Sequence, residues 1–157
     1  EKRKELLVLE KELTRQRDAV TAARQALPRV RVDKEYAFQL VGEGGKLEAP
    51  VSLDTLFGGK QQLIVYHFML GEGWKEGCKS CSLLTDTVDG IVPHLAARDV
   101  SFVVVSRGSS EGIDSFKQRM GWKFPWYRST DSFSADYGVG FEKDEVSDGK
   151  KGFYNYR

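Results

Sequence analysis

The first 27 residues place apolar side chains at the spacing of an amphipathic helix, with charged residues over the remaining positions. Pro28 follows, and proline ends most helices. The pattern predicts a long helix within an N-terminal segment spanning residues 1–28. We expect its stripe to pack on the chain's own domain or on a second subunit, and the sustained seven-residue spacing is compatible with a homodimer through paired helices. The stripe consists of Leu6, Leu9, Leu13, Val20, Ala23 and Leu27.

The pattern changes to a two-residue period after Pro28, in what we expect to be one domain over residues 29–157. Tyr36, Phe38 and Leu40 alternate with small or polar residues, and residues 47–51 form a second short apolar segment. The intervening "GEGG" tolerates the positive φ angles of a tight connection. These features predict an N-terminal β-hairpin.

Two longer runs, "LIVYHFML" at 63–70 and "VSFVVVS" at 100–106, predict buried strands because they are apolar on both faces. We expect the first to be central in its sheet, with helices above and below. Residues 81–95 and 110–120 show helical spacing, the former interrupted by Gly90 and Pro93. Strands alternating with helices predict parallel pairing through right-handed crossovers, hence an α/β fold. Shorter segments complete the prediction: a helical turn at 52–57, an extended piece at 123–130, another turn at 133–141 and a charged surface tail at 142–157.

Composition excludes several classes of protein. The chain has 157 residues, 40% of them hydrophobic and 30% charged, with a formal net charge of +1. This balance lacks the broad basic field of a general nucleic-acid binder. Its longest apolar run is far below the roughly 20 residues that span a bilayer. Two cysteines are too few for a disulfide scaffold and no secretory segment precedes them, so we expect a soluble, cytoplasmic protein.

Cys78 and Cys81 form a C-x-x-C pair between the first buried strand and the helix that follows it. Unpaired N–H groups at a helix start stabilise a thiolate, so Cys78 is the expected nucleophile. Cys81, one turn on and more buried, is placed to resolve a mixed disulfide. Lys79 adds a nearby positive charge. This chemistry predicts a thiol–disulfide oxidoreductase that needs no bound cofactor.

A metal site is the alternative, because cysteine and histidine are soft ligands. Cys78 and Cys81 with either His67 or His94 would supply three ligands suited to copper or zinc. The sequence therefore leaves open a copper or zinc carrier.

Four residues are candidate substrate contacts: Trp74, Lys79, Arg107 and Trp126. Trp74 and the neighbouring glycines would let a flat apolar surface approach the sulfur of Cys78. Arg107 ends the second buried strand, at the edge where α/β sheets bind ligands. Trp126, within "GWKFPWY", could line a groove, although aromatic residues more often pack in a core.

The segments "ELTRQRDAVTAARQALPRVRVDKEYAF", "QLIVYHFM", "W-x-E-G-C-x-S-C-S", "VPHLAARDV", "SRG", "RMGWKFPW" and "DYGV" together resemble domain-of-unknown-function family 899, over about residues 6 to 141. That family is one of predicted dithiol-disulfide oxidoreductases in the thioredoxin-like superfamily. The resemblance implies a thioredoxin-like fold of the extended, peroxiredoxin-like type, with Cys78 and Cys81 as the active pair. It also implies a disulfide-containing protein or small thiol as substrate, and an external reductant.

Two features depart from thioredoxin-like patterns. Such domains usually end with a proline-bearing strand beside the dithiol, yet no proline follows "DYGV". We therefore expect the C-terminal part of the fold to be missing from these 157 residues. The peroxidatic motif of peroxiredoxins also needs a proline and a threonine ahead of its cysteine. "GEGWKEGC" has neither, which counts against a peroxidase of the usual kind.

Overall fold

The computed structural model describes residues 1–139, in two compact units, Glu1–Lys34 and a second that begins at Glu35. The sequence-based boundary lies at residue 28, slightly ahead of this division. Two expectations, the charged tail at 142–157 and the missing C-terminal part of the fold, fall outside the described residues. Within the described part, no helix combines the length and the apolar character needed to cross a membrane.

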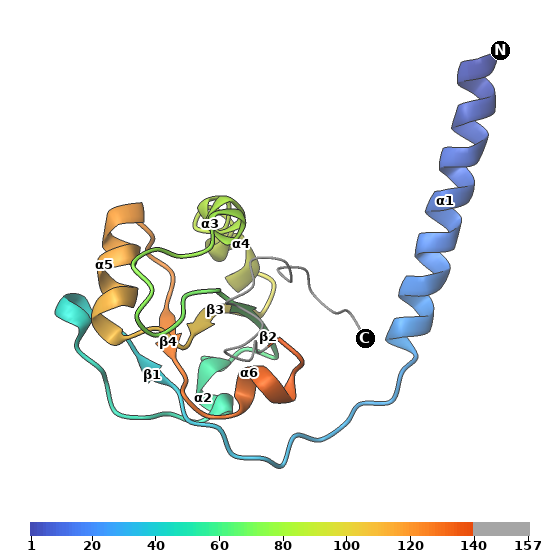
Figure 1. Ribbon diagram of the computed structural model, residues 1–157. Helices are drawn as coiled ribbons and strands as arrows, with labels where there is room; N and C mark the ends of the chain where they lie inside the picture. The colour runs from blue at the N-terminus through green and yellow to red at the C-terminus, as the bar shows by residue number, and fades with distance from the viewer. Residues whose placement is uncertain (140–157) are drawn as a thin grey trace. The chain divides into compact units, whose positions relative to one another are not determined.

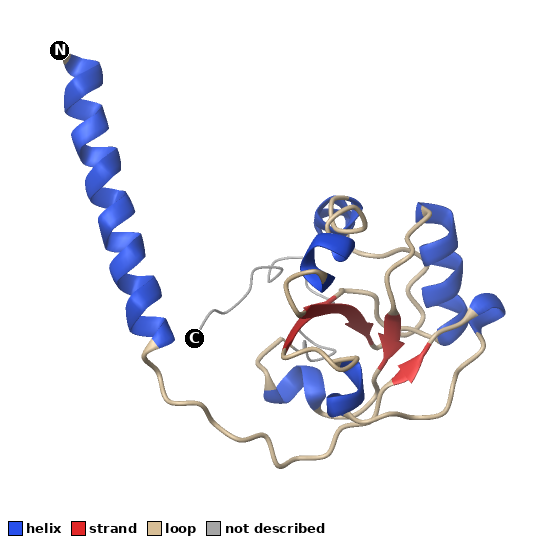
Figure 2. Ribbon diagram, turned by 180° about the vertical axis from the view of Figure 1, so that it is seen from behind, coloured by secondary structure: helices blue, strands red, loops and turns tan. Residues whose placement is uncertain are grey.

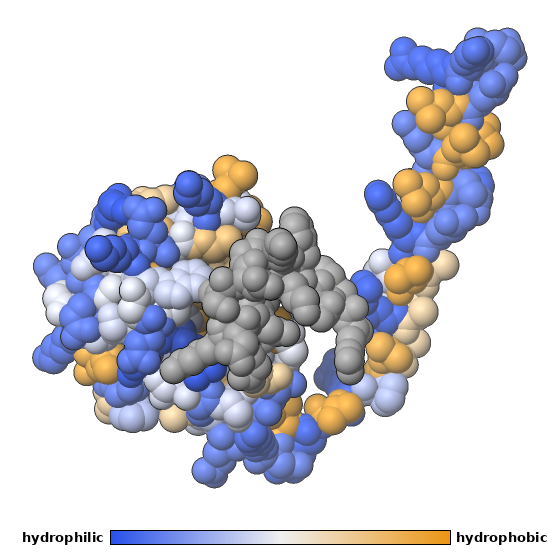
Figure 3. Space-filling view, in the orientation of Figure 1, coloured by the Kyte–Doolittle hydropathy of each residue, from blue (hydrophilic) through white to orange (hydrophobic). Residues whose placement is uncertain are grey.

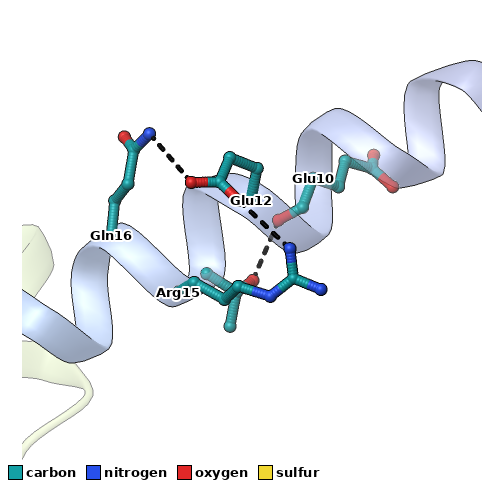
Figure 4. Close-up of polar contacts among 5 residues, drawn as sticks. Glu10, Glu12, Arg15 and Gln16 are labelled. Carbon is teal, nitrogen blue, oxygen red and sulfur yellow. Dashed lines mark hydrogen bonds and ion pairs between the residues drawn. The ribbon is translucent and has the colours of Figure 1, made fainter.

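The first unit contains the predicted long helix, α1 (Lys2–Gln25), none of whose residues is buried. Its polar face carries local contacts: Glu12 pairs with Arg15 at 3.1 Å and accepts a bond from Gln16 at 3.4 Å (Figure 4). Such exposed pairs add only a few tenths of a kcal/mol, roughly, to helix stability. The apolar stripe recurs along α1 in Figure 3, and Leu9 is 67% exposed. Within residues 1–34, the stripe therefore has no partner.

The described part of the second unit is built on a four-stranded sheet in the order β1-β4-β3-β2. Its strands, red in Figure 2, are β1 (Gln39–Leu40), β2 (Gln62–His67), β3 (Val100–Ser106) and β4 (Trp126–Arg128). β3 runs parallel to both β2 and β4, while β1 is antiparallel to β4. The predicted parallel pairing is confirmed.

The expectation that β2 is central is wrong among the described strands. β3 and β4 are the inner strands, and the side chains of β3 are buried from Phe102 to Ser106. β2 ends the order, and its Ile64 is 43% exposed. An apolar run shows that a strand is partly buried. It does not distinguish an inner strand from an outer one that is covered on both faces by helices.

The predicted hairpin surrounds the short helix η1 (Glu43–Gly45). Antiparallel bridges join Phe38 to Val51 and Val41 to Leu47 on either side of it. Gly44 and Gly45 have φ angles of 72° and 73°, a region that glycine enters without steric cost. The "GEGG" stretch therefore forms the tight connection through glycines at positive φ angles, as its composition predicted.

Helices cover both faces of the sheet (Figure 1). One layer contains α3 (Lys79–Asp86), α4 (Val92–Ala96) and α5 (Ser110–Met120), and the other α2 (Leu53–Leu56) and α6 (Phe133–Asp136). The break predicted near Gly90 and Pro93 is confirmed, since Pro93 lies in the first turn of α4. Ser109 caps α5 and Gly121 ends it at a φ of 72°, as expected.

Each layer closes over its own apolar cluster, and β3 contributes to both. Val104 faces the first cluster, which is rich in aromatic rings from Phe68, Phe116, Trp122 and Trp126. Val103 and Val105 face the second, with Tyr36, Phe38, Leu56 and Phe133. Side chains that alternate along one strand therefore bind the two helical layers together.

Trp126 lies fully within the first cluster, at 0% exposure, and its Nε1–H donates to Ser106 Oγ at 2.9 Å. This burial contradicts the sequence-based assignment of Trp126 as a substrate contact. The indole fills the core because its polar edge finds a partner on the adjacent strand.

We expect Trp126→Phe to lower the free energy of unfolding by about 2 kcal/mol, since it leaves a gap and an unpaired Ser106 hydroxyl. Trp74→Phe is the control, because Trp74 is 37% exposed. Urea unfolding followed by circular dichroism compares them. Equal effects of the two substitutions would contradict the buried placement.

Gly77 brings the chain close to the first cluster just before α3. A Cβ at this position would overlap Phe68 Cε1 and would lie 3.0 Å from Phe116 Cε1. Contacts this short require the aromatic rings or the backbone to shift. Gly77 therefore lets residue 78 enter α3 against the two rings.

We expect Gly77→Ala to destabilise the domain by about 2 kcal/mol through this overpacking. Gly90→Ala is a matched control, because no atom lies within 4 Å of its added Cβ. Thermal unfolding of both variants checks the expectation, with Gly90→Ala near the parent. A Gly77→Ala melting curve that overlays the parent curve would refute the close approach.

Candidate functional site

Cys78 and Cys81 occupy the first turn of α3, as their spacing predicted. Cys78 is the N-cap residue, and its Sγ accepts the N–H of Cys81 at 3.4 Å. Its own N–H donates to Met69 O at 3.0 Å, which ties the start of α3 to the segment after β2. Both thiols are free, Cys78 partly exposed and Cys81 only 3% exposed. A donated N–H and an open side are what a nucleophilic sulfur needs.

The first turn is held by further hydrogen bonds. The Ser82 hydroxyl and Ser82 N–H both donate to Cys78 O at 2.9 Å. The Thr85 hydroxyl, fully buried, donates to Cys81 O. These bonds restrict the backbone at both cysteines and so restrict the positions of their sulfurs.

Cys81 lies in an environment that favours its neutral thiol. Burial raises the pKa of Cys81, and its hydrogen bond with Cys78 raises it further. Interactions with the Tyr66 side chain and the Met69 backbone lower the pKa of this thiol in part. The balance is a raised pKa, so Cys81 keeps its proton at neutral pH.

The predicted substrate contacts differ in their exposure to solvent. Trp74 and Lys79 are exposed on either side of Cys78 in the sequence. Arg107 is exposed directly after β3. Trp126, by contrast, belongs to the core.

The histidines do not join the cysteines. His67 lies on the face of β2 opposite α3, where its ring stacks on Phe133 with centroids 5.1 Å apart and its Nδ1 bonds Ser134 Oγ at 3.3 Å. Burial lowers the pKa of His67. His94 is exposed on α4. Across residues 1–139, no three His, Cys, Asp or Glu side chains are grouped to hold a metal ion.

An open hollow of about 340 Å³ lies beside the dithiol, between α3 and α5. Gly77 and Lys79, the two neighbours of Cys78 in the sequence, both line it. Glu76 and Arg119, also in its lining, pair at 3.1 Å, and Arg119 lies over the Phe116 ring at 4.8 Å. Sequence reasoning missed this hollow because α5 follows α3 only after another helix and strand.

Tyr66 is the second feature that the sequence-based prediction overlooked. It precedes Phe68 by two residues on β2, so the two side chains share the face that packs under α3. The alternation of side chains along the strand could have predicted from the sequence that Tyr66 and Phe68 share a face. The dithiol, the parallel strands and the crossover helices together match the thioredoxin-like arrangement that the sequence resemblance implies.

Several solved structures resemble the chain weakly. A cysteine-to-serine mutant of peroxiredoxin Q from Xanthomonas campestris matches with a TM-score of 0.44 and 15% identity, over 66% of this chain and 54% of that one. Another cysteine-to-serine mutant, of PrxQ from Xylella fastidiosa, matches with a TM-score of 0.45 and 18% identity, over 71% of this chain and 60% of that one. Bacterioferritin comigratory protein from Xanthomonas campestris matches at 0.43 and 16%, over 72% and 60%. The chain thus spans less than two thirds of each of these structures, and the likeness is too distant to assign an activity.

No protein with a curated description matches the chain. A family model described as "Bacterial protein of unknown function (DUF899)" matches residues 1–156, nearly the whole length. The same family was indicated by the motifs around the cysteines and the aromatic segment. The chain therefore belongs to this bacterial family, DUF899.

Proposed function

We propose that the chain is a cytoplasmic thiol–disulfide oxidoreductase whose active pair is Cys78 and Cys81. The observation that carries the proposal is the position of Cys78 as N-cap of α3, with its sulfur accepting the Cys81 N–H at 3.4 Å. A helix start and a donated N–H both stabilise negative charge on sulfur. The open hollow lined by Gly77 and Lys79, the neighbours of residue 78 in the sequence, is the proposed place for a substrate.

The reaction has two steps. The Cys78 thiolate attacks one sulfur of a substrate disulfide, breaks that bond and forms a mixed disulfide, releasing the first substrate thiolate. Cys81 then loses its proton and attacks the Cys78 sulfur. The mixed disulfide breaks, the Cys78–Cys81 disulfide forms, and the second substrate thiol leaves with the two electrons and the proton. An external dithiol reductant restores the pair, and the reverse sequence oxidises a substrate.

The substrate is a disulfide-containing protein or a small thiol in its disulfide form. Trp74 and Lys79, exposed near Cys78, are the proposed contacts, and Arg107 is a further candidate at the sheet edge. No step of this chemistry requires a bound cofactor.

Thiol trapping across a graded glutathione redox buffer, read by mass spectrometry, tests the proposal. We expect Cys78 and Cys81 to convert together between dithiol and disulfide. With oxidised glutathione, Cys81→Ser should accumulate a glutathione adduct on Cys78, while the matched variant Cys78→Ser should not. Independent oxidation of the two cysteines, or an adduct on Cys81 alone, would exclude the proposal.

A second proposal concerns α1, which we infer pairs with α1 of another copy to form a homodimer. The stripe residues Leu6, Leu9 and Leu13 are all about half exposed or more, at heptad spacing. Glu12 and Arg17 border this stripe, and in a parallel pair each faces the opposite charge on the other helix.

Analytical ultracentrifugation of the full chain tests the pairing. We expect Leu13→Glu to convert a dimer into a monomer, because it places a charge in the seam. Val8→Glu is the control, since Val8 is exposed on the same helix but lies off the stripe. A monomeric parent, or equal effects of the two variants, would rule out a homodimer through this stripe.

A further inference from the structure

The hollow between α3 and α5 follows one face of α3 along its whole length. The two helices lie on the same side of the sheet (Figure 1). The α3 residues in the lining recur at the i, i+3, i+4 and i+7 spacing of a single helix face. They are Lys79, Ser82, Leu83 and Asp86, and the first and last of them are also the first and last residues of α3. The hollow therefore has one end beside Cys78 and another end two helical turns away.

The two ends of this face carry opposite charges. Lys79 is exposed next to Cys78 and forms no ion pair within residues 1–139. Asp86 is exposed as well, and its Oδ1 accepts the Trp122 Nε1–H at 2.8 Å. An indole N–H is neutral, so this bond leaves the carboxylate charge in place. Seven residues of helix separate the two charges by about 10 Å along the axis.

The other charged residues of the lining compensate each other. Glu76 Oε1 lies 3.1 Å from Arg119 Nη1, and the guanidinium also lies over the Phe116 ring. This pair adds no net charge to the hollow. The uncompensated charges that a ligand would meet there are the Lys79 ammonium and the Asp86 carboxylate.

The size of the hollow restricts its ligand to a small molecule. Its volume of about 340 Å³ lies near the lower limit of small-molecule sites, which span roughly 300–1,000 Å³. A complementary ligand has a carboxylate close to its disulfide and an ammonium group about 10 Å away. A short peptide has both groups, because its free chain ends lie close to its cysteine. A cysteine within a protein chain is generally far from both termini, so protein disulfides do not match this charge pattern.

We propose that the hollow binds a zwitterionic short-peptide disulfide, with Lys79 at the peptide carboxylate and Asp86 at its ammonium group. The proposal rests on the thiol–disulfide function argued above and narrows its substrate. The Cys78 thiolate attacks the nearer peptide sulfur, the peptide disulfide bond breaks and the Cys78–peptide disulfide forms. The second peptide leaves as a thiolate with the electron pair of the broken bond.

The test measures how fast the Cys78 adduct forms in the full chain carrying Cys81→Ser, in which the adduct cannot resolve. Acid quenching and mass spectrometry follow the adduct at neutral pH and low salt. The probes are oxidised glutathione, which is a zwitterionic peptide disulfide, and hydroxyethyl disulfide, which is uncharged. The ratio of the two rates cancels any change in the reactivity of Cys78 itself.

We expect Asp86→Asn to lower this ratio about threefold, the size of an exposed ion pair. The substitution removes the charge and keeps an oxygen that can accept the Trp122 Nε1–H. Asp54→Asn is the matched control, because Asp54 is exposed on α2 in the other helical layer. In about 1 M salt, which reduces the screening length to about 3 Å, the difference between the two variants should disappear.

Lys79→Gln should also lower the ratio about threefold, with Lys46→Gln as its control, since Lys46 is exposed and lies outside the hollow. Cystamine, a disulfide with an ammonium group near each sulfur, gives a change of the opposite sign. Relative to hydroxyethyl disulfide, it should react faster with Lys79→Gln than with the parent. A purely structural defect would not reverse sign with the charge of the probe.

The outcomes distinguish this inference from the function on which it rests. If Cys78 reacts with the probes and the ratio is the same in the parent, Asp86→Asn and Lys79→Gln, the peptide site is refuted. The oxidoreductase then stands, with protein disulfides as its substrates. If the parent forms no Cys78 adduct with any of the disulfides, the function fails and the peptide site fails with it.

Discussion

The structure of the second unit depends on the burial of β3 on both faces. Parallel strands pair with β3 on each side, so its backbone is satisfied within the sheet and its side chains must find apolar cover above and below. Val104 meets one helical layer, while Val103 and Val105 meet the other. Removing either layer would expose half of an apolar strand. The two layers and the sheet order are therefore consequences of one constraint.

The candidate site follows from the same arrangement. Because β2 pairs in register with β3, Tyr66 and Phe68 face the layer that contains α3. Gly77 then packs on Phe68, and residue 78 begins the helix within hydrogen-bonding reach of Met69 O. The cysteines are thus positioned by aromatic packing and backbone bonds that involve neither sulfur directly.

The burial that places Cys81 also makes its ionisation unfavourable. Removing a thiol from water penalises the thiolate, which protects Cys81 from solvent chemistry but slows any reaction in which it is the nucleophile. The Tyr66 side chain and the Met69 backbone offset part of that penalty. Cys78, at the N-cap of α3, is partly exposed and is therefore less buried than Cys81. Two thiols separated by two residues therefore have different environments, which suits them to different steps.

Elements whose causes are local can be predicted from the sequence alone. Apolar spacing predicted α1. Gly90 and Pro93 predicted the break before α4, and the glycines at Gly44 and Gly45 predicted the hairpin connection. The place of the C-x-x-C pair after an apolar run predicted that it begins a helix. Each depends on residues within a turn or two of the chain. The inner position of β3, the burial of Trp126 and the separation of His67 from the thiols depend instead on the tertiary structure. The physical reason is that a side chain's partners across a sheet or between helices depend on strand order and register, which residues distant in the sequence set together.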